Sequence, residues 1–314
     1  MRYYDINIGN GLRRYTSFPN NVNDPGALRV YLDLNVYDYV SPTGASIVKI
    51  MGTPFADLTQ SLDLQNKSIT ISGGFQKGLP LANPSQAGLL VQGTIFQAFG
   101  NWLGTEMSLD LVLAPPTGTA DAPVNLVVSW QKGQTMADAL ATAFTTAFPS
   151  FKQSINISPK LVLAYSQTGY YKTLAELSAS VRVISRAIVG GSYNGVSVAV
   201  QGQTITVFDG TSATSPKQIA FNDLIGQPTW LDPGTIQLTM PMRADLRVSD
   251  YVKLPPGFGG PGTTITVPQA LSTLRQGSVF QGTFIVSSLR HVGDSRQPDA
   301  QAWVTVANVN PVGK

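Results

Sequence analysis

The stretch LRVYLDLNV, residues 28–36, alternates apolar side chains with Arg29, Tyr31, Asp33 and Asn35. Successive side chains of a β-strand point to opposite faces, so a period of two makes one face apolar and the other polar. The stretch therefore predicts a strand of an antiparallel sheet that packs one face on a core.

More strands are expected after this one, because apolar stretches alternate with turn-forming clusters. The predicted strands are residues 47–51, 67–72, 88–99 and 107–113, and the turns are residues 41–44, 72–74 and 82–85. Glycine, proline, asparagine and serine concentrate in these turns. Several short strands at such spacing predict a barrel or a sandwich.

The pattern changes after residues 114–122, a Pro-, Thr- and Gly-rich stretch that predicts a domain boundary. Strand and helix then alternate, which predicts a compact α+β unit whose apolar helix faces form its core. The predicted helices are residues 135–148, capped by Thr135 and followed by Pro149, and residues 173–188. The predicted strands are residues 124–130 and 161–165.

The last third of the chain returns to strand patterns. Residues 196–200 and 204–208 predict a hairpin, and further strands are expected at residues 236–240, 251–254, 279–289 and 303–309. The Pro- and Gly-rich stretch 255–262 predicts a long surface loop. No internal repeat of 20–50 residues is visible.

The 314 residues carry an unusually low share of charge, 12%, about half the usual ~25%. Such a surface suits large permanent contacts with other subunits, because their burial desolvates few ions; a secreted β-protein is the alternative. The 21 basic and 18 acidic residues give a net charge of +3, and no basic run exceeds Arg13-Arg14. Specific DNA binding is not indicated, since it usually needs clustered cations.

The sequence has no cysteine, so a disulfide framework and thiolate metal sites are excluded. Residues 1–10 do not have the pattern of a signal peptide, and no apolar run approaches the ~20 residues of a membrane-spanning helix. We therefore expect a protein kept in a cytoplasm-like compartment, or exported without such a signal.

The one histidine, His291, could form a hydrolytic triad with Asp294 and with Ser287 or Ser288. The sequence disfavours this interpretation, because no nucleophile-elbow motif Gly-x-Ser-x-Gly stands in a strand-turn-helix setting. We expect His291 to be a structural residue at the end of a strand.

Glycan hydrolysis would need two paired carboxylates. The only glutamates, Glu106 and Glu176, are expected in different domains, and spacing selects no pair among the aspartates. No calcium loop, His/Cys metal site or phosphate loop is present, and residues 257–262 lack the lysine of the last. The sequence predicts no catalytic, cofactor-binding or metal-binding residue, no cofactor, and no enzyme activity.

Three stretches become informative when they are taken together. They are NLVVSWQKGQ (125–134) with the helix ending at Ala147-Phe148-Pro149; IAFNDLIGQPTW (219–230) with Ile236 and MRADLRVSDYVKLP (242–255); and FQGTFIV (280–286), RHVGD (290–294) and AWVTV (302–306). The last group predicts a hairpin with a long polar loop. Together the stretches resemble the central baseplate hub proteins of contractile-tailed bacteriophages. The resemblance spans residues 125–309 and is only architectural over residues 1–113. Related hubs often carry glycine where this chain has Ser249.

The resemblance implies a mainly β fold with an α+β insertion. Residues 1–113 would form a first tail-tube-like β-barrel, residues 122–189 the α+β insertion, and residues 190–314 a second tail-tube-like β-barrel. Three copies would place six barrels in a ring, matching a six-fold tail tube on one side and a three-fold spike on the other. The implied function is a structural virion protein, a trimeric baseplate hub that forms part of the channel for DNA and the tape-measure protein.

The implied partners are two further copies, the tail tube protein, the spike or needle protein, baseplate wedge proteins and the tape-measure protein, with DNA passing non-specifically. The implied location is the baseplate of the virion tail, assembled in the host cytoplasm. One alternative is another tube or distal tail protein, or the hub part of a type VI secretion spike. Another is a carbohydrate-binding or glycan-degrading tail protein with an aromatic groove, for which the candidate residues are Tyr3, Tyr4, Tyr15, Tyr170 and Tyr171.

Overall fold

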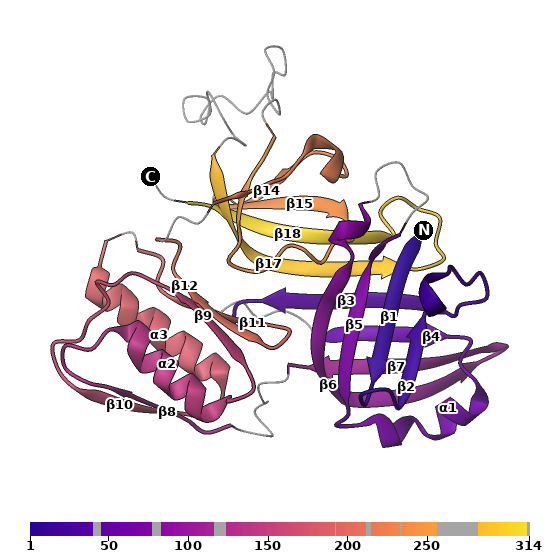
Figure 1. The fold of residues 1–314 in the computed structure, drawn as a ribbon, viewed down its shortest axis with the longest axis horizontal. Coiled ribbons are helices and arrows are strands. Elements are labelled where there is room, and N and C mark those ends of the chain that lie inside the picture. Colours follow the sequence, from indigo (N-terminus) through magenta and orange to yellow (C-terminus); the bar gives the residue numbers. More distant parts are fainter. Residues whose placement is uncertain are drawn as a thin grey trace, which may run out of the picture.

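The computed structural model describes residues 1–39, 45–76, 83–115, 124–191, 193–211, 215–232, 234–255 and 282–312. Strands dominate these residues, and the two long helices lie together in one part of the molecule (Figure 1). The predicted fold class, mainly β with an α+β part, is confirmed.

The first β-unit comprises the strands β1 to β7, and its two layers of strands cross (Figure 1). The strands are β1 (Arg2–Ile8), β2 (Arg13–Thr16), β3 (Arg29–Tyr37), β4 (Ser46–Met51), β5 (Ser68–Phe75), β6 (Gly88–Leu103) and β7 (Glu106–Ala114). The helix α1 (Phe55–Thr59) and the 3-10 turns Pro19–Asn21, Ser61–Leu64 and Pro84–Gln86 connect them. Alternate residues of β3 are buried, as its sequence pattern predicts. Val30, Leu32 and Leu34 face a core built mainly of isoleucine, leucine and valine.

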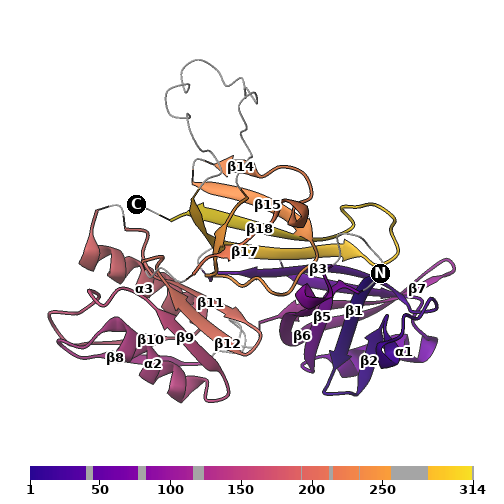
Figure 2. The ribbon, with the colours of Figure 1, turned by 45° about the horizontal axis from the view of Figure 1, so that its top comes forward.

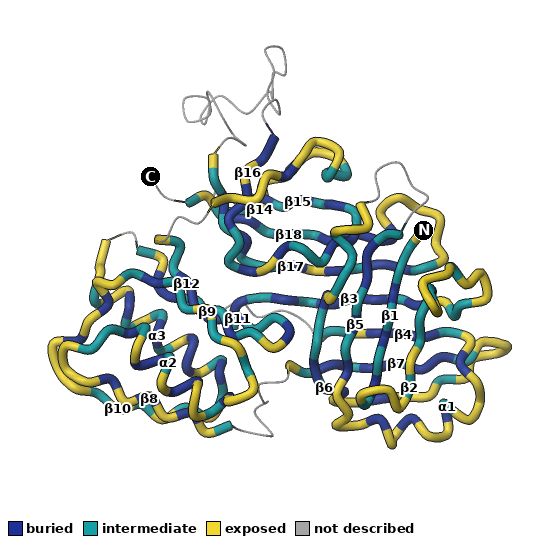
Figure 3. Tube along the Cα trace, in the orientation of Figure 1, coloured by how far each residue is buried: buried dark blue, intermediate teal, exposed yellow. Residues whose placement is uncertain are grey.

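The α+β unit encloses a second core between two helices and two small sheets. Its elements are β8 (Leu126–Trp130), α2 (Met136–Ala147), β9 (Lys152–Asn156), β10 (Gln167–Tyr171), α3 (Leu174–Val189), β11 (Ser197–Gln201) and β12 (Thr204–Phe208). The helix α2 begins where predicted, because the Thr135 hydroxyl accepts a hydrogen bond from the Asp138 amide at 3.1 Å. Figure 3 shows that each helix buries one side and exposes the other.

The second β-unit contains the remaining strands and a third core. Its elements are β13 (Lys217–Gln218), the 3-10 turn Phe221–Asp223, β14 (Thr229–Asp232), β15 (Thr235–Pro241), β16 (Tyr251–Lys253), β17 (Thr283–Asp294) and β18 (Trp303–Pro311). The predicted hairpin with a long polar loop is the pair β17–β18.

The strands of both β-units form one continuous sheet. Among the described residues it has 13 strands, with the main order β14-β15-β18-β17-β3-β4-β7-β6-β5-β1-β2. The units join where β17 pairs with β3, and both views show these strands side by side (Figures 1 and 2). Just after β3, Asp38 bridges to Ala199 of β11. The strand predicted from residues 28–36 therefore contacts all three units.

The two β-units repeat the same pairing pattern. In the first unit the antiparallel order is β3-β4-β7-β6-β5, and in the second it is β14-β15-β18-β17-β16. Each long strand carries a bulge at the same place, between Ile95 and Gln97 in β6 and between Val286 and Ser288 in β17. The fold thus contains a duplication that no sequence repeat reveals.

Several expectations need correction. The boundary drawn at residues 189/190 separates the β11–β12 hairpin from the helices, whereas β12 pairs with β9 and the hairpin completes the core of the α+β unit. Residues 161–165 form no strand; Val162 makes one isolated bridge to Thr135. Prediction also missed β1, β2, β9, β10, β13 and β14. The stretches 116–122 and 256–262 lie outside the described residues.

Candidate assembly site at the junction of the two β-units

The pairing of β3 with β17 forms the backbone of the junction. Seven residues, Ser288–Asp294, pair with Tyr37–Tyr31 in antiparallel register. Two arginine–carboxylate pairs accompany the strands: Arg290 contacts both oxygens of Asp33 at 2.7 Å, and Arg29 contacts Asp294 at 2.6 Å. Arg290 and Arg29 are about half exposed, so each pair contributes at most ~1 kcal/mol but fixes the register.

Side chains of the second β-unit complete the core of the first. Trp303 at the start of β18 is fully buried in the first core, and its indole N–H donates to the Gly74 carbonyl at 2.9 Å. Met242 packs in the same core, where its sulfur would lie 3.2 Å from a Cβ added at Gly73. The first β-unit therefore has no complete core alone.

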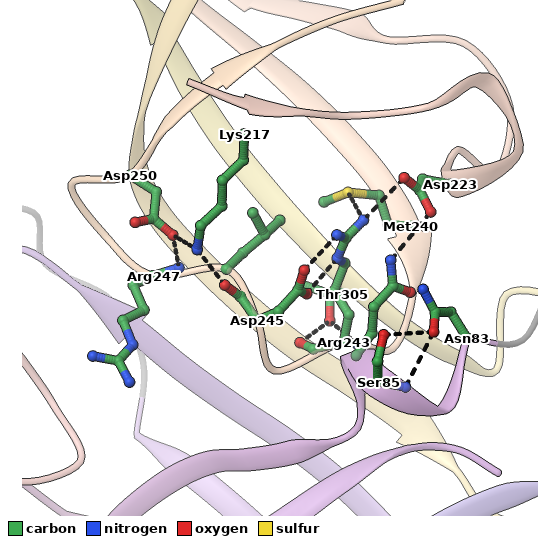
Figure 4. Close-up of polar contacts among 12 residues, drawn as sticks. Asn83, Ser85, Lys217, Asp223, Met240, Arg243, Asp245, Arg247, Asp250 and Thr305 are labelled. Carbon is green, nitrogen blue, oxygen red and sulfur yellow. Dashed lines mark hydrogen bonds and ion pairs between the residues drawn. The ribbon is translucent and has the colours of Figure 1, made fainter. Parts of the chain in front are cut away.

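Arg243 is the central charged residue of the junction (Figure 4). It follows β15 and is only 4% exposed. Its Nε and Nη2 atoms donate to the two oxygens of Asp245 at 2.7 Å each, and Nη1 lies 3.5 Å from Asp223 Oδ2. Burial alone would lower the pKa of this guanidinium, but the hydrogen bonds and charges of Asp245 and Asp223 outweigh it, so the pKa is raised. Arg243 thus stays charged with two carboxylates around it.

This charged cluster is bonded to the first β-unit through Gln86. Gln86 Nε2 donates to Asp223 Oδ1 at 3.3 Å, and the Gln86 carbonyl accepts from the Ala244 amide at 2.7 Å. The 3-10 turn that carries Gln86 is held by Asn83, whose Oδ1 accepts from the Ser85 amide and hydroxyl (Figure 4). The cluster therefore connects both β-units by directional bonds, which set their relative orientation.

The turn that follows Arg243 is held against β17 within the second β-unit. Ser249 has a left-handed φ of +81°, and its amide donates to the Val286 carbonyl at 2.8 Å. Asp250 accepts from the Arg247 amide and from Lys217 Nζ, both at 2.7 Å. The predicted polar turn at Ser249-Asp250 is present, and the positive φ explains why glycine suits this position.

His291 lies inside the junction and forms no triad. It is fully buried, its Nδ1 lies 2.9 Å from the Thr305 hydroxyl, and its Nε2 has no partner among the described residues. Burial lowers the pKa of His291 to about 4. Asp294 is bonded to Arg29, and the Ser287 hydroxyl donates to the Asn308 carbonyl at 3.1 Å. Ser288 pairs with Tyr37 in the sheet. The hydrolase interpretation is therefore wrong for this set of residues.

The other candidate residues are dispersed. Glu106 begins β7, whereas Glu176 lies in the first turn of α3 and accepts from the Lys172 amide at 2.7 Å. Of the five candidate tyrosines, Tyr3, Tyr4 and Tyr15 belong to the first β-unit and Tyr170 and Tyr171 to the α+β unit, so they line no common groove. The described residues include no group of three or more histidine, cysteine, aspartate or glutamate side chains placed to hold a metal. No helix among them is long and apolar enough to cross a membrane.

The sequence predicts no role for Arg243, Asp223 or Asp245. Its signal for the cluster is weak: an arginine and an aspartate two residues apart, between the apolar residues Met242 and Leu246. Such a pair is normally solvated, and its burial depends on segments more than 60 residues away.

Comparison with known proteins places the fold. Neither a protein-family model nor a curated protein sequence matches the chain. Among solved structures, the 43 kDa tail protein of prophage MuSo2 from Shewanella oneidensis superposes with a TM-score of 0.52 at 8% identity, covering 100% of both chains. A tail protein from Neisseria meningitidis MC58 gives 0.50 at 10% identity, covering 98% of this chain and 96% of the other.

A third structure, a Francisella PdpA-VgrG complex in its lidded form, gives a TM-score of 0.51 at 7% identity. The match covers 99% of this chain and 53% of the other, so this chain spans about half of that protein. At these identities the likeness concerns the fold. The chain therefore has the fold of phage tail proteins, with two joined β-units and an α+β unit.

Proposed function

We propose that this chain is a structural protein of a contractile phage tail, a trimeric baseplate hub that joins the six-fold tail tube to the three-fold spike. The observation that carries the proposal is the duplicated pairing pattern of the two β-units. Three copies of a chain with two equivalent units present six units in a ring. Such a ring offers pseudo-six-fold symmetry to one neighbour and true three-fold symmetry to the other.

The junction supports this role, because a symmetry adaptor must keep its two β-units at a constant angle. Strand pairing, the shared core residue Trp303 and the buried Arg243 cluster all restrict that angle. Two of the residues considered for catalysis are engaged in structural contacts: His291 with Thr305, and Glu176 with the start of α3. We therefore propose a protein without enzymatic activity or cofactor.

The proposed partners follow from this position in the tail. They are the tail tube protein, the spike or needle protein, wedge proteins and the tape-measure protein, and DNA would pass through the ring without specific contacts. The proposed location is the baseplate of the virion tail, after assembly in the host cytoplasm. The three-part division of the chain is also a proposal, now with the β11–β12 hairpin in the α+β unit.

Electron microscopy of the purified protein at about 100 µM tests the proposal. We expect a ring with a central hole, six lobes and three-fold symmetry. Its mass should be three times 33.4 kDa, or about 100 kDa. A ring of six chains would instead favour a tube protein, and a strict monomer would contradict the hub. Glycan binding or sugar release by the purified chain would favour the carbohydrate alternative.

A further inference from the structure

The long strand β6 has two halves with different surroundings. Residues 88–94 pair with β5, a bulge follows at Phe96, and residues 97–103 pair with β7. Within the described parts of the chain, no backbone hydrogen bond joins residues 97–103 to any other element. An open strand edge of this kind is a template for pairing with another strand.

The same edge is occupied in the second β-unit. There β17 pairs with β16 through residues 283–285, carries its bulge after Val286, and continues with residues 288–294. These last seven residues pair with β3, the strand that begins the repeated order β3-β4-β7-β6-β5 of the neighbouring β-unit. The equivalent edge is therefore the place where one β-unit pairs with the end strand of the next unit's repeated order.

We propose that the edge of β6 at residues 97–103 pairs with β14 of a second copy of this chain. In the repeat, β14 takes the place of β3, and among the described strands it ends the sheet opposite β2. The inference rests on the proposed function, because it names the contact that joins the copies. Since the two edges differ, the contact is head-to-tail, which is the kind that closes a ring.

The repeat also sets the register of this contact. Asn101 stands four residues after Gln97, as Val292 stands four residues after Ser288, and Val292 pairs with Asp33. In the first β-unit, Asp33 pairs with Ile47 of β4. The residue of the second β-unit that corresponds to Ile47 is Gln237 of β15, and Gln237 pairs with Thr229. Thr229 therefore corresponds to Asp33. Asn101 is therefore expected opposite Thr229 of the second copy.

The surface of the β6 edge suits a permanent contact between proteins. Residues 97–103 include no charged residue, while Phe99, Trp102 and Leu103 are 46%, 65% and 73% exposed. The Trp102 indole N–H already donates to the Gly104 carbonyl at 2.9 Å, so a partner can cover the ring without leaving a buried donor unsatisfied. Phe55 of α1 supports the ring edge-on at 5.9 Å. On β14, Leu231 is 52% exposed and offers an apolar surface in return.

Engineered cysteines test the contact directly, because the natural chain has none. In the double variant Asn101→Cys/Thr229→Cys, antiparallel neighbours 4.5–5.5 Å apart at Cα fall within disulfide range. We expect oxidation at about 100 µM to convert most chains to covalent dimers and trimers. The matched control, Asn101→Cys/Thr168→Cys, places its second cysteine on the exposed face of β10 and should cross-link at least ten-fold less.

A second variant keeps the test independent of disulfide chemistry. Phe99→Lys places a charge on the open edge, as natural edge strands do to prevent pairing. It should weaken association at least ten-fold in sedimentation while the melting temperature of the chain stays unchanged. Cross-linking no greater than in the control, or full association of Phe99→Lys, would overturn the inference.

The outcomes also separate this inference from the hub proposal. If a three-fold ring forms but the Asn101–Thr229 cross-link does not, the proposed strand contact is wrong and the hub proposal is unaffected. A cross-linked ladder that runs past three chains supports the strand contact and contradicts the trimeric hub.

Discussion

Replacement of Arg243 tests whether the buried charge cluster holds the junction. Removing one partner of a buried ion pair costs about 3–5 kcal/mol when the other charge stays buried. The Arg243 side chain is 5% exposed, but those of Asp245 and Asp223 are 34% and 21% exposed, so water reaches the carboxylates that are left. We therefore expect Arg243→Met to lower the free energy of unfolding by about 2–3 kcal/mol.

Arg290 provides a matched control. Its guanidinium makes a bidentate contact with Asp33, at 2.7 Å to each carboxylate oxygen, as that of Arg243 does with Asp245. The Arg290 side chain, however, is 52% exposed. Arg290→Met should cost less than about 1 kcal/mol. Urea unfolding at pH 7, followed by tryptophan fluorescence, measures both variants. Adding Asp245→Asn to Arg243→Met should recover at least ~1 kcal/mol, because the pair is coupled. If Arg243→Met and Arg290→Met lowered the free energy of unfolding equally, the conclusion that the buried cluster holds the junction would be refuted.

Three further predictions concern single residues. Ser249→Gly should stabilise the chain by about 0.5–1 kcal/mol in urea, because a φ of +81° strains a residue with a Cβ, whereas Ser249→Val should destabilise it. The pKa of His291 is about 4 in the folded chain and 6.5 for the free side chain. As the pH falls, the unfolded chain is therefore protonated at a higher pH than the folded chain. About 3 kcal/mol of stability is lost as the pH falls from above 6.5 to 4. His291→Gln should flatten that pH dependence, and an unchanged slope would assign it to other groups. Thr173→Ala removes the hydroxyl that accepts from the Glu176 amide at the start of α3 and should cost about 1 kcal/mol, read from hydrogen exchange in the first turn.

The sequence predicts elements well where burial imposes a period on them. The strand expected at residues 28–36 is Arg29–Tyr37, and the helix expected at 135–148 is Met136–Ala147. The missed strands have weaker patterns for a physical reason. Within the described residues, β9 and β14 lie at sheet edges. β9 is mostly polar, and all four residues of β14 are exposed, so neither strand shows an alternation of buried and exposed residues. β1 is different, because Tyr4, Ile6 and Ile8 alternate and were available to prediction.

The duplication could not be read from the sequence, because equivalent positions have different neighbours. Gly100 in β6 corresponds to His291 in β17, counted from the two bulges. A side chain at Gly100 would meet the Leu58 carbonyl of α1 at 2.7 Å, so only glycine fits there. His291 instead contacts Thr305 at the junction. The two β-units therefore share a strand order, but the residues at equivalent positions differ because they contact different neighbours.

The two kinds of edge differ in a way that bears on assembly. The contact within the chain, β3 with β17, is fixed by Arg290–Asp33, Arg29–Asp294 and the burial of Trp303. Residues 97–103, which occupy the equivalent place on β6, include no charged residue and expose Phe99, Trp102 and Leu103. Ion pairs set a register inside one molecule at little cost, since the covalent chain already brings the strands together. A contact between separate chains must also offset lost translational freedom, and apolar area contributes more to that than exposed ion pairs do. The difference between the two edges is thus the one expected if β17 joins units within a chain and β6 joins chains.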